Sequence, residues 1–327
     1  MRTTLALPNG DAVTPVNSAL MLLQMLVEYL RLAQQLPSLG SDAVHRIAEL
    51  LKVFNSRTCQ LVLGAGAMQV SGLRSITAKH LALAQQSLSL ILAVMPALRA
   101  ALGPLLPGQR HGLLLQEMDR VAQDYTLHKG EIHAKLVAIM RERLQVHCKR
   151  LPTVAATWAE EEQQDVNEVK QEQEEGGEEG KAAAAAVTTP AVEPSDFAKA
   201  LSKEVGTLRR VIVNLLSPAD RRDIFGKVLD LFDAQLADSF AKIEKNAAAA
   251  AASNAASAAS DDDVVGGGDT TANRRGVVAA TGNTAAHIRA DGALLMQTLS
   301  SLAEGGDGVK VGSSPCAPLL AARLSSK

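Results

Sequence analysis

The sequence predicts an all-α protein, a multi-helix bundle interrupted by two disordered low-complexity insertions. Aromatic residues make up only 2% of the 327 residues, whereas sandwiches, barrels and stacking platforms for single-stranded nucleic acid rely on them. Alanine and leucine must therefore build the core, and both favour helices. Between the low-complexity blocks, apolar residues recur at helical spacing.

The amino-terminal part, residues 1–157, is expected to be helical throughout. Its periodicity and its capping residues predict helices over 16–36, from Ser41 onward, over 75–102 and over about 113–147. Pro96 is expected to kink or stop the third of these helices. The uncharged stretch from His80 to Leu98 has membrane-spanning length, but its Gln, Ser and Pro residues favour a buried helix of a soluble protein.

A helical hairpin is expected over 194–245. The first helix carries one apolar stripe, namely Phe197, Leu201, Val205, Leu208, Ile212 and Leu215. Ser195 and Asp196 can cap its start, and Ser217 followed by Pro218 opens the second helix. The connection is so short that the two helices should run antiparallel.

Two blocks without apolar periodicity separate these parts. Residues 158–193 pass from an acidic run into alanines, and we expect them to be disordered or at most a solvated helical extension. Residues 246–276 pass from alanine and serine into aspartate and glycine, and we expect a flexible linker.

The carboxy-terminal segment 277–304 is expected to be a helix that docks back on the bundle, followed by a flexible tail over 305–327. Its apolar stripe consists of Ile288, Leu295, Leu299 and Leu302. A helix this short is marginal alone, so packing of these leucines must order it.

Charge and cysteine content exclude several classes of protein. The formal net charge is −2, but outside the acidic stretch 160–181 the chain has 31 basic and 25 acidic residues. This mild basic excess is not the strongly basic face of a nucleic-acid binder, so no nucleic-acid partner is expected. The three cysteines stand far apart, which argues against a disulfide framework or a zinc site and favours a reducing compartment.

No catalytic, metal-binding or cofactor-binding constellation is evident, and we expect a protein that is not an enzyme. One alternative is a nucleotide-binding enzyme that uses the turn at Gly64 and Gly66, although Gln69 stands where the third glycine is needed. Another alternative is a generic helical adaptor. Adjacent helical residues point about 100° apart, so His147 and Cys148 are expected to be a surface histidine and a packing cysteine rather than a ligand pair.

Four arginines flank the turn of the hairpin: Arg209, Arg210, Arg221 and Arg222. Gathered at one end of the bundle, they are candidates for docking to anionic headgroups or to an acidic partner. The alternative is an ordinary solvated helix end.

Residues 54–69, FNSRTCQLVLGAGAMQ, closely resemble the start of the signature region of the vacuolar protein sorting-associated protein 54 family. The likeness extends over about 16–302 outside the low-complexity blocks, through Asp124-Tyr125, the run 131–140 and Thr281-Gly282-Asn283.

This resemblance implies an elongated helical subunit of the Golgi-associated retrograde protein complex, which tethers endosome-derived vesicles at the trans-Golgi network. The implied partners are vacuolar protein sorting-associated proteins 51, 52 and 53, with SNARE proteins, small GTPases and an anionic membrane surface as further candidates. The implied location is the cytosol, peripherally on trans-Golgi network and endosomal membranes. In that family the carboxy-terminal half, which this chain resembles, is linked to endosomal attachment, whereas assembly relies on an amino-terminal coiled region.

Overall fold

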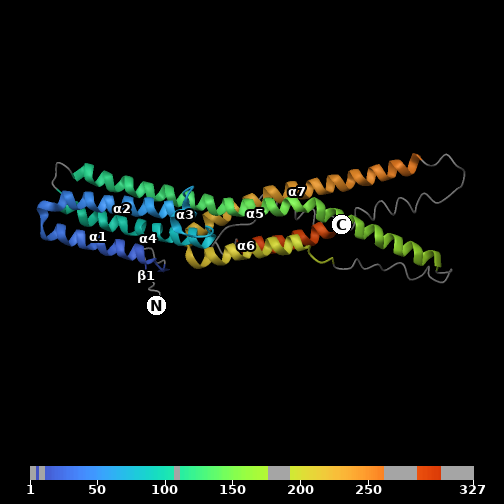
Figure 1. The fold of residues 1–327 in the computed structure, drawn as a ribbon, viewed down its shortest axis with the longest axis horizontal. Coiled ribbons are helices and arrows are strands. Elements are labelled where there is room, and N and C mark those ends of the chain that lie inside the picture. The colour runs from blue at the N-terminus through green and yellow to red at the C-terminus, as the bar shows by residue number, and fades with distance from the viewer. Residues whose placement is uncertain (1–4, 7–11, 107–110, 176–191, 261–285, 303–327) are drawn as a thin grey trace. The chain divides into compact units, whose positions relative to one another are not determined.

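The computed structural model describes residues 5–6, 12–106, 111–175, 192–260 and 286–302 (Figure 1). In these ranges the regular structure is helical apart from a two-residue antiparallel ribbon, in which β1 (Leu5–Ala6) pairs with β2 (Ala12–Val13). The predicted all-α fold class is confirmed. The helices are α1 (Asn17–Gln35), α2 (Gly40–Val62), α3 (Ala67–Ser71), α4 (Ala78–Leu102), α5 (His111–Glu175), α6 (Asp196–Leu215), α7 (Pro218–Ser260) and an unlabelled helix over 286–302.

The chain forms two compact units. The first comprises Met1–Ile139, Thr207–Phe225 and Gly305–Asp307, and the second comprises Met140–Gly206, Gly226–Glu304 and Gly308–Lys327. Because α5, α6 and α7 each contribute residues to both units, the unit boundaries fall inside helices rather than at the low-complexity blocks.

In the first unit, α1, α2 and α4 lie side by side and contact one another (Figure 1). Ile47 and Leu51 of α2, Leu81 and Leu88 of α4, and Ile132 of α5 are all fully buried. These positions follow the helical spacing of the sequence, because one apolar stripe on each helix is enough to close such a core. The buried Tyr125 hydroxyl of α5 donates a hydrogen bond of 2.8 Å to the Leu51 carbonyl oxygen.

Pro96 lies inside α4, which continues to Leu102. The proline therefore does not stop the helix, and the alternative expectation of a kink at Pro96 stays a prediction. The segment Ala78–Leu105, which contains α4, is the one segment among the described helices that has the length and apolar composition of a membrane span. The first half of α4 nevertheless supplies buried core residues, as expected for a core helix.

The glycine pair at Gly64 and Gly66 lies in a helix break. The apolar residues before it belong to α2, which ends at Val62, and α3 begins at Ala67. A dinucleotide-binding turn needs a strand at this place, so the structure contradicts the nucleotide-binding alternative at its first requirement.

In the second unit, the predicted stripe of α6 and apolar residues of α7 form the interior. Phe197, Leu201 and Val205 of α6 are buried, as are Phe232 and Phe240 of α7. The helix over 286–302 joins them through Ile288, Leu295, Leu299 and Leu302, all of which are buried.

Both long helices continue into the low-complexity blocks. Helix α5 ends at Glu175, in accord with the solvated helical extension considered for the first block, and α7 ends at Ser260, beyond the expected linker start at 246. Alanine, glutamate and glutamine are strong helix formers, so helix can continue there without an apolar stripe. Residues 176–191 and 261–276 lie outside the described residues, and for them disorder stays a prediction.

Candidate functional site

The turn between α6 and α7 carries the predicted basic surface. The Ser217 hydroxyl accepts a 3.3 Å hydrogen bond from the Asp220 backbone N–H, which is the expected helix cap. Arg210 and Arg222 are exposed, whereas Arg209 and Arg221 are half-buried. The structure thus places two of the four arginines in open contact with solvent, and their role in docking stays a prediction.

Two aspartates in the same turn were missed by the sequence analysis. Asp220 Oδ1 lies 3.1 Å from Lys129 Nζ and 3.6 Å from His133 Nε2, both on α5. Asp223 Oδ2 lies 2.6 Å from His133 Nδ1. The end of the hairpin therefore directs its carboxylates to α5.

Helix α4 completes this polar network. Gln85 Nε2 lies 2.9 Å from His133 Nε2, and the Ser89 hydroxyl donates a 3.3 Å hydrogen bond to Asp220 Oδ2. His133 has only 8% of its side chain exposed. Buried polar groups are costly unless paired, so these contacts specify the positions of α4, α5 and α7 relative to one another within the first unit.

A sequence signal for this network existed. Gln85 and Ser89 stand four residues apart in α4, and that spacing places both side chains on one face of the helix. What the sequence could not supply was the partner, because Asp220 follows Ser89 by 131 positions. In the part of the chain that the structure describes, no group of three or more His, Cys, Asp or Glu residues is arranged to hold a metal ion.

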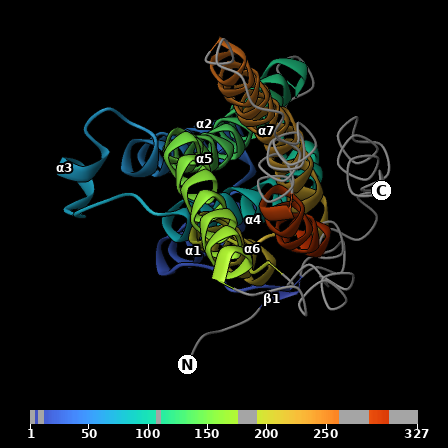
Figure 2. The ribbon, with the colours of Figure 1, turned by 90° about the vertical axis from the view of Figure 1, so that its right-hand side faces the viewer.

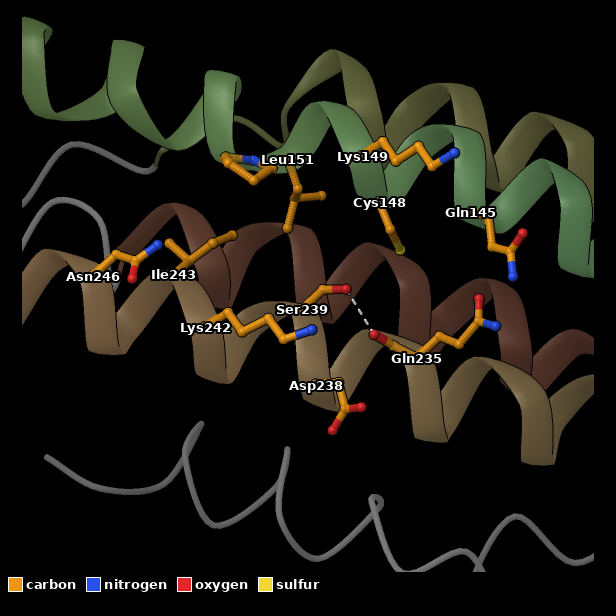
Figure 3. Close-up of a pocket in the computed structure, with 11 residues that line it drawn as sticks. Gln145, Cys148, Lys149, Leu151, Gln235, Asp238, Ser239, Lys242, Ile243 and Asn246 are labelled. Atoms are coloured by element: carbon orange, nitrogen blue, oxygen red, sulfur yellow. Dashed lines mark hydrogen bonds between the residues drawn. The ribbon is translucent and has the colours of Figure 1, made fainter.

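A groove of about 530 Å³ lies between α5 and α7 in the second unit (Figure 3). Figure 3 shows Cys148 of α5 pointing toward Ser239 of α7, beside Gln145 and Gln235. Burial raises the pKa of the Cys148 thiol, and the hydrogen bond with Ser239 offsets this only in part. A thiol held in its protonated form is a poor nucleophile, so the groove offers packing surface rather than an activated cysteine.

The neighbouring His147 points elsewhere, as the sequence predicted. Its ring meets Phe197 edge-on with ring centroids 6.1 Å apart, and its Nε2 atom lies 3.6 Å from Glu204 Oε1. The expectation of a surface histidine is wrong, however, because only 14% of the His147 side chain is exposed. The α6 residues that cover it are distant in sequence, which is why periodicity alone could not show the burial.

The helix over 286–302 is fixed by polar contacts that the sequence analysis also missed. Asp291 is fully buried, and its carboxylate accepts hydrogen bonds of 2.6 Å from both the backbone N–H and the hydroxyl of Ser195. Burial raises the pKa of Asp291, and the hydrogen bonds from Ser195 oppose that rise. Trp158 stacks on His287 with ring centroids 4.9 Å apart.

Comparison with known proteins gives one consistent family. Residues 11–143 match the family model described as "Vps54-like protein". The chain is 42% identical over 229 residues to "Vacuolar protein sorting-associated protein 54, chloroplastic" of Arabidopsis thaliana, and these residues are 70% of this chain. It is 44% identical over 131 residues, 40% of the chain, to vacuolar protein sorting-associated protein 54 of Homo sapiens. It is 30% identical over 233 residues, 71% of the chain, to the Drosophila melanogaster protein of that name.

The matches cover only part of these relatives. They span 20% of the Arabidopsis and Drosophila proteins and 13% of the human protein. No solved structure matches the chain significantly. The resemblance stated from residues 54–69 is confirmed, and those residues lie inside the region that the family model matches.

Proposed function

Because the chain belongs to the Vps54 family through residues 11–143, we propose that it is a non-enzymatic subunit of a vesicle-tethering complex. In this proposal it acts in retrograde transport from endosomes to the trans-Golgi network, in the cytosol and peripherally on those membranes. The observation that carries the proposal is the 42% identity over 229 residues to a vacuolar protein sorting-associated protein.

The proposed partners are vacuolar protein sorting-associated proteins 51, 52 and 53. SNARE proteins and small GTPases are further candidates. The helical architecture supports a scaffold role, because amphipathic helices with long exposed faces suit assembly with other helical subunits.

The α6–α7 turn is the proposed attachment point for an anionic membrane or an acidic partner. Arg210 and Arg222 are exposed there, while Asp220 and Asp223 are engaged by Lys129 and His133. Exposed cations at the end of a helical hairpin can attract negative charge.

Two measurements test this function. A tagged full chain should co-precipitate proteins 51, 52 and 53 and should co-localise with endosomal and trans-Golgi markers. Replacing Arg209, Arg210, Arg221 and Arg222 by glutamine should weaken salt-sensitive membrane recruitment, and the double variant at the exposed Arg210 and Arg222 should do so with little change in thermal stability, since exposed charges contribute little to folding. A chain that neither co-precipitates these subunits nor reaches these membranes would contradict the proposal, and unchanged recruitment of the variant would remove the arginine site alone.

A further inference from the structure

Acidic residues are absent from a long stretch of the first unit. Between Glu49 and Glu117 the sequence contains no Asp or Glu, while it contains six basic residues, namely Lys52, Arg57, Arg74, Lys79, Arg99 and Arg110. Two of these are neutralised from outside the stretch, because Lys52 pairs with Glu117 at 2.7 Å and Arg99 pairs with Asp119 at 3.0 Å.

The centre of this stretch protrudes from the helices. The connection from α2 to α4 contains the short helix α3, which stands to one side of α1 and α4 (Figure 2). Gly72 ends α3 in the left-handed conformation, with φ of 68°, which glycine adopts without strain. The chain can therefore reverse there and return to Thr77, whose side chain caps α4.

The protrusion exposes large apolar side chains. The exposed fractions are 40% for Leu61, 50% for Met68, 58% for Val70 and 37% for Leu73. Met68 and Val70 are two positions apart on α3, so their side chains point to opposite sides of the helix. Both sides of α3 therefore leave apolar surface uncovered.

Three cations lie close to these apolar residues along the sequence. Arg57, Arg74 and Lys79 are exposed. Arg57 hydrogen-bonds the amide oxygen of Gln60 at 3.2 Å, and none of the three forms an ion pair with a described residue. The stretch itself supplies no carboxylate to neutralise them.

We propose that this α3 surface, formed by Arg57, Leu61, Met68, Val70, Leu73, Arg74 and Lys79, inserts into the headgroup region of an anionic lipid bilayer. The apolar side chains enter the interface while the three cations contact lipid phosphates and carboxylates. The inference rests on the membrane attachment in the proposed function, but it places a contact away from the α6–α7 arginines.

The geometry favours a bilayer over a partner protein. A protein docks on one face, whereas lipid surrounds an inserted tip and covers Met68 and Val70 on opposite sides of α3 together. The three cations of the α3 surface also carry charge of one sign, which matches the negative surface of anionic membranes.

Co-sedimentation of the full chain with lipid vesicles tests the proposal. The wild-type chain should bind vesicles that contain phosphatidylserine and not vesicles of phosphatidylcholine alone, and binding should fall as salt rises. The variant with Met68→Ser, Val70→Ser and Leu73→Ser should bind about tenfold more weakly, because the inserted apolar surface is lost. The variant with Arg57→Gln, Arg74→Gln and Lys79→Gln should bind more weakly and with a flatter salt dependence.

Insertion can be observed directly with Val70→Trp. Brominated lipids should quench this tryptophan, whereas the native Trp158, only 4% exposed in the second unit, should not be quenched. All these substitutions are at exposed positions, so circular dichroism should show an unchanged melting temperature. A matched control replaces three exposed apolar residues of α1 by serine, namely Met21, Met25 and Leu32, and should bind as the wild type does.

Three results would overturn the proposal: a wild-type chain that ignores phosphatidylserine vesicles, a serine variant of α3 that binds as the wild type does, or an α1 control that loses as much binding. In each case the proposed function is judged separately by recruitment to endosomal membranes in cells. Recruitment that persists without lipid binding would indicate a protein receptor, which is the alternative occupant of this surface.

Discussion

The two units bury aspartate in opposite ways. In the first unit, Asp220 is surrounded by Lys129, His133 and Ser89, so its charge is met by cations and a hydroxyl. In the second unit, Asp291 is fully buried and is met by the backbone N–H and the hydroxyl of Ser195 at the start of α6. The first arrangement is a charge network across three helices, and the second is a helix cap donated by another helix.

The difference shows what each carboxylate stabilises. A helix start carries unsatisfied N–H groups and a partial positive charge, so Asp291 stabilises the start of α6 chiefly through its hydrogen bonds from Ser195, with weaker electrostatic attraction from His287 and Lys199. The network at Asp220 needs its cation, since a buried charge that loses its partner is strongly unfavourable. Substitutions should therefore affect the two units by different mechanisms.

The largest effect is expected from Leu295→Gln, which tests whether apolar burial rather than Asp291 holds the helix over 286–302. Leu295 is 2% exposed, and the change loses burial and leaves an amide poorly satisfied. The loss should be about 2–4 kcal/mol of unfolding free energy. Denaturant unfolding measures it, and cellular abundance should fall as well.

Leu127→Gln is the matched control, because Leu127 is 66% exposed. It should change the unfolding free energy by less than about 0.5 kcal/mol. An equal effect of the two substitutions would show that the carboxy-terminal helix does not dock.

Lys129→Met should cause the next largest loss of unfolding free energy, because it removes the cation that lies 3.1 Å from Asp220 Oδ1. Since His133 and Ser89 remain as partners and Lys129 is 22% exposed, we expect a loss of roughly 2 kcal/mol, smaller than for a fully buried ion pair. Urea unfolding of the variant measures the loss. Lys135→Met, an exposed position on the same helix, should be nearly neutral, and a similar loss in both variants would contradict the network.

Asp291→Ala should cost about 1–2 kcal/mol, because two donors of Ser195 lose their acceptor at the start of α6. Asp291→Asn keeps an acceptor for the backbone N–H and removes the buried charge, so it should cost less than Asp291→Ala. Thermal unfolding of both variants distinguishes a helix cap from a charge partner. Equal losses in the two variants would show that the negative charge itself is required.

The pH dependence of the unfolding free energy gives a further test of the role of Asp291. The raised pKa of Asp291 means that the folded state binds a proton more tightly than the unfolded state does. As pH falls toward the ordinary aspartate pKa, the wild type should therefore gain stability relative to Asp291→Asn, and it should lose that gain as pH rises. A difference between the two proteins that does not change with pH would contradict this assignment.

The smallest expected effect is on the reactivity of two thiols, Cys59 in the first unit and Cys148 in the second. Burial raises the pKa of Cys59 to about 11 and raises that of Cys148 as well. Both thiols should react with iodoacetamide at pH 8 more slowly than an unperturbed cysteine, and Cys59 at least about tenfold more slowly. Peptide mapping by mass spectrometry measures each site. Ser239→Ala removes the hydrogen bond that lowers the Cys148 pKa and should slow that site alone.

The sequence by itself determined the helices and the faces that they bury. Stripes such as Phe197, Leu201 and Val205 are read correctly because helical periodicity is local, and Ser195 and Ser217 are read correctly as caps because a cap acts within three residues. The family followed from the contiguous run 54–69, which no physical pattern could have named.

Only the tertiary structure decided which polar groups meet. Asp291 joins Ser195 across 96 positions and His133 joins Asp223 across 90, while the α6 residues that cover His147 are also distant from it in sequence. Hydrogen bonds and burial depend on such long-range partners, which propensity and periodicity do not encode. The uncovered apolar tip at Met68 and Val70 belongs to the same category, because exposure is a property of what the rest of the chain leaves uncovered.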